Sequence, residues 1–187
     1  WFGFNGFSQL AMGTFDDVNA ISKIAVNTHL AGAAGTVTGA ALTRLIGGKT
    51  DIVMMLNGAL AGLVAITAEP LTPGPITAMI IGSIGAVIMY YGTKMLESYG
   101  LDDVVGAIPV HMFAGIFGTL VVPLTNSDTT FGTQLIGVIS VCIFSFVLSY
   151  ITFSSLKSTI GLRISKSAEK QGTDKAEVGV IAYSIRD

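Results

Sequence analysis

Five long stretches without a charged residue constrain this chain more than any other feature. They cover residues 24–43, 52–68, 70–93, 104–127 and 129–156. A helix that crosses the hydrocarbon core of a bilayer needs about 20 apolar residues, within a range of about 17–25. All five stretches meet the lower limit, and residues 1–15 form a sixth uncharged segment. The pattern therefore predicts a polytopic, all-α membrane protein that resides in the lipid bilayer.

The charge content supports this prediction. The 187 residues include ten Lys or Arg and twelve Asp or Glu, so that 12% of the chain is charged, against roughly 25% in ordinary soluble domains. Hydrophobic residues make up 51% of the chain, which has one cysteine. This composition excludes a disordered segment, a nucleic-acid-binding domain and a secreted domain held by disulfides.

The expected helices form one membrane domain followed by a polar tail. They are predicted near residues 1–13, 19–43, 51–69, 75–97, 104–124 and 131–158. Together they make up a domain over residues 1–158, and the tail over residues 159–187 holds nine of the charges. Glycine recurs at helical spacing, as at Gly58 and Gly62. Small residues at this spacing allow helix backbones to approach closely in lipid, so we expect a tightly packed bundle.

The positions of the basic residues predict the orientation. Lysine and arginine gather near residues 44–51 and 94–103 and in the tail, whereas the alternate connections carry acidic residues. Lys23 is the exception among the cations. Since cytoplasmic loops carry an excess of Lys and Arg, we expect a multi-pass protein of the cell membrane with a cytoplasmic C-terminus.

His111 is the titratable residue that lies deepest in an uncharged stretch. It is eight residues beyond Asp103, or roughly 10–12 Å along a helix, which places it near the middle of the bilayer. An ionisable side chain there is costly, so a functional role is favoured. The alternative is a neutral histidine that bonds to a neighbouring helix. His29 adjoins Asn27 and Thr28, and we expect it to make a structural bond between helices.

No group of histidine, cysteine and acidic side chains has the spacing of a metal site. We therefore expect neither a metal nor a cofactor. The N-terminal aromatic residues allow two interpretations. Trp1 and Phe4 are three residues apart and share a helix face. They belong either to an interfacial aromatic belt or to a hydrophobic constriction of the kind that gates a pore.

Six motifs in a fixed order resemble the ammonium transporter family (Amt/Mep/Rh). They are WFGFN at 1–5, VNT at 26–28, NGALAGLVAITA at 57–68, DDVVGAIPVH at 102–111, GIFGTL at 115–120 and GLR at 161–163. The resemblance covers nearly the whole chain. It implies the second half of an eleven-helix fold with inverted repeats, from the sixth to the eleventh transmembrane helix and the cytoplasmic tail.

The resemblance also implies a function and roles for four residues. The function is transport of ammonium or ammonia through a hydrophobic pore, without enzymatic chemistry. His111 matches the second of two pore histidines, and Trp1 matches a tryptophan that lines the pore beside them. Phe4 matches a gate phenylalanine, and Ser8 matches the serine of the outer ammonium-recruitment site. The expected partners are ammonium, the other subunits of a homotrimer and a PII-type regulator at the tail.

The chain departs from the family pattern in several places. The first pore histidine and the recruitment tryptophan belong to the first half of the family fold, which these residues do not match. Phe7 and Met112 replace smaller residues beside the recruitment serine and the pore histidine. In the tail, Val178 and Val180 stand where many members have histidine and glutamate. Two alternatives therefore stay open: an ammonium sensor with the same fold, and a non-functional truncation whose isolated 187 residues show no uptake.

Overall fold

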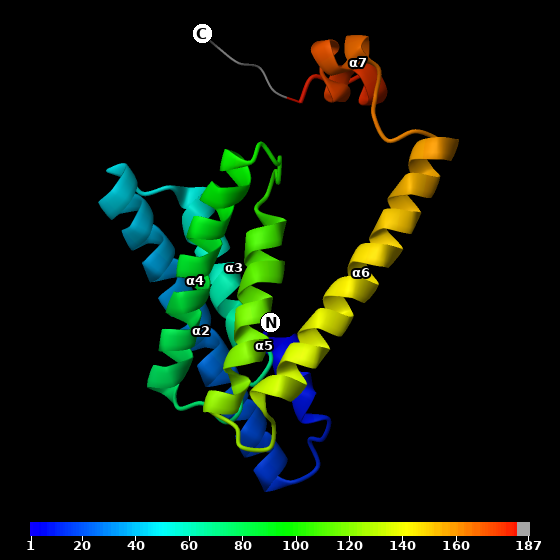
Figure 1. Ribbon diagram of the computed structural model, residues 1–187. Helices are drawn as coiled ribbons and strands as arrows, with labels where there is room; N and C mark the ends of the chain where they lie inside the picture. The colour runs from blue at the N-terminus through cyan, green and yellow to red at the C-terminus, as the bar shows by residue number, and fades with distance from the viewer. Residues whose placement is uncertain (183–187) are drawn as a thin grey trace. The chain divides into compact units, whose positions relative to one another are not determined.

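The computed structural model describes residues 1–182 and contains only helices and connections within them (Figure 1). The all-α fold class predicted from the sequence is confirmed. The elements are α1 (Phe2–Gly6), η1 (Phe7–Gln9), α2 (Phe15–Gly47), α3 (Ile52–Ile66), α4 (Pro75–Ser98), η2 (Ile108–Phe113), α5 (Ala114–Val121), η3 (Val122–Leu124), α6 (Phe131–Thr159), α7 (Lys166–Gln171) and η4 (Asp174–Val178).

The chain forms two compact units, Trp1–Val138 and Ile139–Asp187. Helix α6 runs through the point of division. The boundary between a membrane domain and a tail, expected near residue 158, stays a prediction. Residues 183–187, the end of that expected tail, lie outside the described residues.

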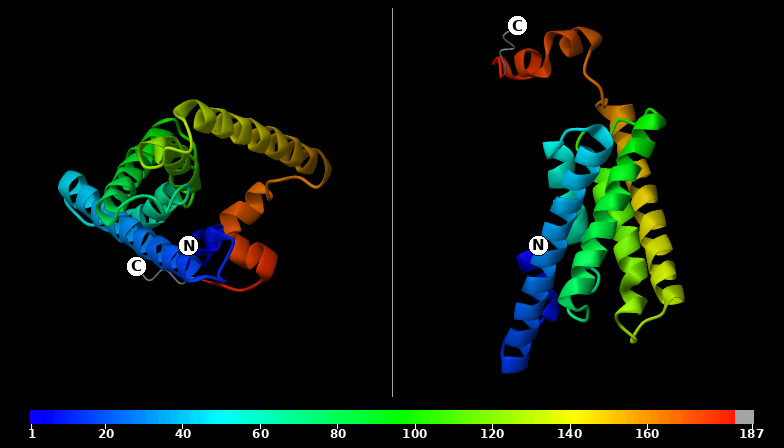
Figure 2. Two further views of the ribbon diagram at one scale, coloured as in Figure 1. Left: turned by 90° about the horizontal axis from the view of Figure 1, so that it is seen from below. Right: turned by 90° about the vertical axis from the view of Figure 1, so that its left-hand side faces the viewer.

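Helices α2, α3, α4 and α5 lie side by side in the first unit (Figures 1 and 2). Local sequence fixes where these helices begin and end. A capping box opens α2, in which Asp17 donates its backbone N–H to the Thr14 hydroxyl at 3.1 Å and accepts the Thr14 backbone N–H at 3.0 Å. Gly48 closes α2 in the left-handed conformation, with φ of 75°. Pro75 opens α4 at a position where its missing N–H is not needed.

Glycine makes the contact between α2 and α3 close. A Cβ atom added to Gly58 would lie 2.6 Å from the carbonyl oxygen of Gly35, and one added to Gly35 would collide with the carbonyl oxygen of Gly58. A Cβ atom on Gly62 would likewise collide with the carbonyl oxygen of Ala31. The closely packed bundle expected from glycine spacing is therefore present at this helix pair.

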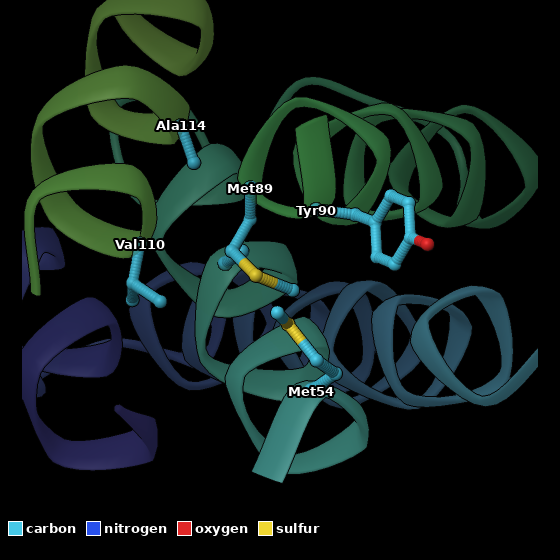
Figure 3. Packing of buried hydrophobic residues seen from close by; sticks show 6 residues of the cluster. Met54, Met89, Tyr90, Val110 and Ala114 are labelled. Atoms are coloured by element: carbon cyan, nitrogen blue, oxygen red, sulfur yellow. The ribbon is translucent and has the colours of Figure 1, made fainter. Parts of the chain in front are cut away.

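A small hydrophobic core joins α3, α4 and the segment around α5. Figure 3 shows its side chains, with two methionines facing each other across the helices. The buried residues are Met54, Ala61, Met89, Tyr90, Val110 and Ala114. Met89 and Val110 are almost fully buried. This core holds the segment that carries His111 against the rest of the bundle.

Helices α4 and α6 are the two in residues 1–182 that are long and apolar enough to cross a membrane. Two further apolar helices, over Ile52–Ile66 and Ile108–Leu124, are shorter. The sequence prediction overestimated the first helix, expected near 1–13. It ends at Gly6, and Leu10 adopts the left-handed conformation with φ of 60°, which a continuous helix cannot contain. The helix expected near 104–124 begins with η2 at Ile108, because Gly106 has φ of 73°.

Candidate functional site

The rings of Trp1 and His111 stack on each other. Their centroids lie 6.3 Å apart, and the ring planes differ by 19°. Trp1 precedes α1, whereas His111 lies in the π-helical turn η2. The two candidate pore residues, from distant parts of the sequence, are therefore neighbours in the structure.

A hydrogen bond fixes the far edge of the Trp1 ring. Its indole Nε1 donates to the Thr67 hydroxyl at 2.7 Å. Thr67 directly follows α3 as its C-terminal capping residue, and its own hydroxyl donates to the carbonyl oxygen of Leu63 at 2.7 Å. The Trp1 ring thus connects the C-terminal end of α3 with the turn that carries His111.

Asp103 fixes the start of the turn that carries His111. Its two carboxylate oxygens accept the backbone N–H groups of Ala107 at 2.9 Å and Ile108 at 2.8 Å. These N–H groups have no partner within the helix, and a carboxylate is favourable at a helix N-terminus. The π-helical geometry that follows is rare and is found often at functional sites.

Asn57 holds the connection that precedes the turn. Its side-chain amide donates to the carbonyl oxygen of Val105 at 3.0 Å. A Cβ atom at Gly106 would lie 2.8 Å from the same amide nitrogen. The positive φ of Gly106 and this close approach both require glycine. The Asn57 bond therefore ties α3 to the connection that positions His111.

The short helix α1 is seated on α2 through Asn5. Its side-chain amide donates to the Thr28 hydroxyl at 3.1 Å, and both residues are fully buried. The backbone N–H of Asn5 bonds to the carbonyl oxygen of Trp1 at 2.9 Å. This anchor and the Thr67 bond hold the two ends of α1 against different helices.

Phe4 and Ser8 lie on the same short segment as Trp1. The Phe4 ring is 71% exposed, and the Ser8 hydroxyl donates to the Phe4 carbonyl oxygen at 3.2 Å. The lone pairs of the Ser8 oxygen remain as acceptors. The structure brings Trp1 and His111 into contact and places Phe4 and Ser8 at the start of the chain. The roles of all four residues stay predictions.

His29 differs from its expected structural role. Its ring stacks on Phe2, with centroids 6.2 Å apart and planes that differ by 25°, and makes no hydrogen bond within residues 1–182. Asn27 and Thr28 make the bonds between segments instead. The Asn27 amide donates to the carbonyl oxygens of Pro70 and Pro73, both at 2.9 Å.

The stacked pair presents both apolar and polar groups. His111 is an exposed residue, and Trp1 is 38% exposed. An imidazole can donate one hydrogen bond and accept another, while the indole face offers an apolar surface that attracts cations. Such a surface suits a small molecule that exchanges between a cation and a neutral hydrogen-bonding form.

Sequence reasoning missed Thr67 and the roles of Asp103 and Asn57. Thr67 is one of few hydroxyl groups near the end of an apolar stretch, which is the only signal that marks it. The side chain of Asn57 bonds to the connection at Val105, which is distant in sequence. These bonds depend on tertiary packing that no local pattern describes.

Comparisons with known proteins give one consistent result. A sequence model described as the Ammonium Transporter Family matches residues 1–183. Ammonium transporter Amt2 of Archaeoglobus fulgidus is 41% identical over 98% of this chain and 42% of its own length. Ammonium transporter Amt2 of Methanocaldococcus jannaschii is 35% identical over 98% of this chain and 43% of its length.

Solved structures of the same kind resemble the fold. A protein titled Sensor Amt Protein aligns with a TM-score of 0.85 and 32% identity, over 95% of this chain and 45% of that one. Mep2 of Candida albicans aligns with a TM-score of 0.78 and 25% identity, over 89% of this chain and 40% of that one. The chain therefore spans less than half the length of the relatives that it matches.

Proposed function

Because the chain belongs to the ammonium transporter family, we propose that the protein containing it moves ammonium or ammonia across a cell membrane. As a member of that family, the chain is part of a helical membrane bundle. Its relatives include proteins named ammonium transporters. The chain spans 42% of the first of these relatives, so the proposal concerns a protein of which these residues form a part.

The contact between Trp1 and His111 is the observation that carries the proposal. The rings stack at 6.3 Å, and both are accessible. A wall made of an indole face and an imidazole combines low polarity with one donor and one acceptor. Such a surface suits ammonia, because ammonia is neutral and both donates and accepts hydrogen bonds.

We assign the first step to Phe4 and Ser8. The exposed Phe4 ring offers a face for a cation, and the Ser8 oxygen offers an acceptor for an ammonium proton. Moving the cation into an apolar space disfavours its charged form and lowers its pKa. Ammonium then passes a proton to the histidine relay, which is the second step, and continues as ammonia. Potassium has no proton to release, which is the basis of selectivity in this proposal.

We assign the second step to His111. Its imidazole bonds to ammonia in the pore and shares the proton relay with a second histidine. That second histidine lies in the part of the family fold that these residues do not match. The proposed assembly is a homotrimer with the tail in the cytoplasm. The basic residues near 44–51 and 94–103 support this orientation of the tail. A PII-type regulator is the proposed partner of the tail.

The test uses a full-length protein that contains these residues, reconstituted in liposomes. We expect the protein to take up ammonium and not to take up potassium. The His111→Ala variant should change the rate or the selectivity between ammonium and potassium. The Thr36→Val variant is a control, because Thr36 only donates to a carbonyl of its own helix, that of Gly32 at 2.9 Å. Unchanged flux and selectivity in His111→Ala would show that His111 has only a structural role.

A sensor is the second candidate function. The likeness to a structure titled Sensor Amt Protein, at a TM-score of 0.85, favours it. A sensor would bind ammonium and change the state of its tail without net flux. Ammonium binding measured by calorimetry, together with zero uptake in the same preparation, would favour the sensor over the transporter.

A further inference from the structure

Thr67 makes two hydrogen bonds, which engage its hydroxyl proton and one of the two lone pairs of its oxygen. Its proton is donated to the carbonyl oxygen of Leu63 at 2.7 Å. Its oxygen accepts the indole N–H of Trp1, also at 2.7 Å. The distance to Trp1 is short for an N–H···O bond and the distance to Leu63 is usual for an O–H···O bond, so both bonds are well formed. The hydroxyl therefore has no free proton to offer to a molecule in the pore.

The direction of the first bond is set within α3. Threonine hydroxyls bond readily to the carbonyl four residues earlier in a helix, as Thr67 does with Leu63. Since the proton is committed there, the oxygen lone pairs point away from the helix as acceptors. Trp1 has a single polar atom, its indole N–H, which can only donate. The two side chains are thus complementary in one orientation.

The second bond sets the orientation of the Trp1 ring. A tryptophan side chain rotates about two bonds, and the N–H is at the edge of the ring. Fixing that edge to the end of α3 selects one rotamer, in which the ring plane lies within 19° of the His111 imidazole plane. Asp103 fixes the other partner independently through the start of η2.

From this geometry we propose that Thr67 is a positioning residue for ammonium passage, acting through Trp1 on His111. It orients the indole that forms the apolar wall beside the imidazole, and it does not itself bind ammonium. This inference rests on the proposed transport function. It adds to that function a residue outside the four implied by sequence resemblance.

The test compares four single variants and one double variant of the full-length protein in liposomes. Thr67→Val keeps the side-chain shape and removes the acceptor, and Thr67→Ser restores the hydroxyl. Trp1→Phe keeps a ring and removes the N–H. Thr36→Val is the matched control, because Thr36 is also half-buried and makes the same kind of bond to the carbonyl four residues earlier, but has no tryptophan partner.

We expect Thr67→Val to lower ammonium flux by up to about tenfold, the upper range of the net contribution of one hydrogen bond. Thr67→Ser and Thr36→Val should stay close to the wild-type flux. In the Trp1→Phe background, Thr67→Val should produce no further loss, since the N–H that it serves is gone. The ¹⁵N–¹H signal of the Trp1 indole, assigned by its absence in Trp1→Phe, should shift in Thr67→Val and not in Thr67→Ser.

Some results would overturn the role of Thr67 and leave the transport function intact. They are wild-type flux in Thr67→Val, an undiminished effect of that substitution in the Trp1→Phe background, or an indole signal that does not shift. A Thr67→Ser variant as impaired as Thr67→Val would also contradict it, because the hydroxyl would then be irrelevant. A wild-type protein without ammonium flux would overturn the transport function itself, and with it the role given to Thr67.

Discussion

The buried side-chain amide of Asn5 donates a 3.1 Å hydrogen bond to the Thr28 hydroxyl and thereby seats α1 on α2. Both residues have no exposed surface. The same short helix begins directly after Trp1. By holding α1 in place, the Asn5 bond therefore helps to position the Trp1 ring, which contacts His111.

We predict that Asn5→Ala destabilises the protein and lowers transport together. The substitution leaves the Thr28 hydroxyl buried without its donor and removes the anchor of α1, which should lower the free energy of unfolding by about 1–3 kcal/mol. Thr28→Ser is the control, because it keeps the acceptor. Denaturant unfolding and ammonium flux measure the two effects. An Asn5→Ala variant as stable as the wild type would show that α1 is held by other contacts.

A second prediction concerns the close contact of α2 and α3. In Gly35→Ala the new methyl group meets the backbone carbonyl of Gly58, which cannot move aside as a side chain could. We expect overpacking to destabilise the bundle by about 1–3 kcal/mol and to lower the yield of folded protein. Gly47→Ala on the same helix is the matched control, since nothing lies within 4 Å of its added Cβ atom. Equal thermal stability of the two variants would contradict the close approach.

The positions of the two long apolar helices, α4 and α6, could be predicted because they depend on local features. The helix expected over 75–97 agrees with α4, which begins at Pro75 and ends at Ser98. The last apolar helix was expected over 131–158 and runs over Phe131–Thr159. In both cases the uncharged stretch locates the helix, which then continues past the next charged residue, Lys94 in α4 and Lys157 in α6.

The local geometry of the site could not be predicted in the same way. Nothing in the sequence around Leu10 indicates a left-handed residue that ends the first helical segment. The π-helical turn at His111 comes directly after the bonds of Asp103, and Val110 within it packs in the core. The site residues themselves were identified by family resemblance, whereas the contact of Trp1 with Thr67 depends on how distant segments pack.

A third prediction concerns the tail. The Asp174 carboxylate accepts the backbone N–H of Ala182 at 2.9 Å, and this bond lowers the pKa of Asp174 below its ordinary value of 3.8. The folded form therefore binds the proton more weakly than the unfolded form. The stabilising contribution of the ionised Asp174 carboxylate is complete above pH 3.8 and is lost as the pH falls through the lower pKa of the folded form.

Selective ¹⁵N-alanine labelling would measure this behaviour. The Ala182 amide signal should titrate with a midpoint below 3.8 in the wild-type protein. In Asp174→Asn the same signal should not titrate over this range, because the neighbouring carboxylate is gone. A wild-type midpoint at or above the ordinary value would mean that the Ala182 bond is absent in solution.

The last prediction concerns the isolated chain. His111 and Phe4 are exposed on the first unit, and the chain spans 42% of the length of Amt2 from Archaeoglobus fulgidus. A pore requires walls on all sides, and transporter folds built from inverted repeats place their sites between the two repeats. We therefore expect the isolated 187 residues to give no ammonium or methylammonium uptake in liposomes.

A full-length protein that contains the same residues, reconstituted at the same ratio of protein to lipid, is the comparison. It should take up ammonium, and His111→Ala should alter that uptake, whereas the isolated chain should match empty vesicles. Robust uptake by the isolated chain would show that copies of these residues complete a pore among themselves. In that case the partner of His111 would have to come from another copy of the chain, because His29 lies on α2 and stacks on Phe2.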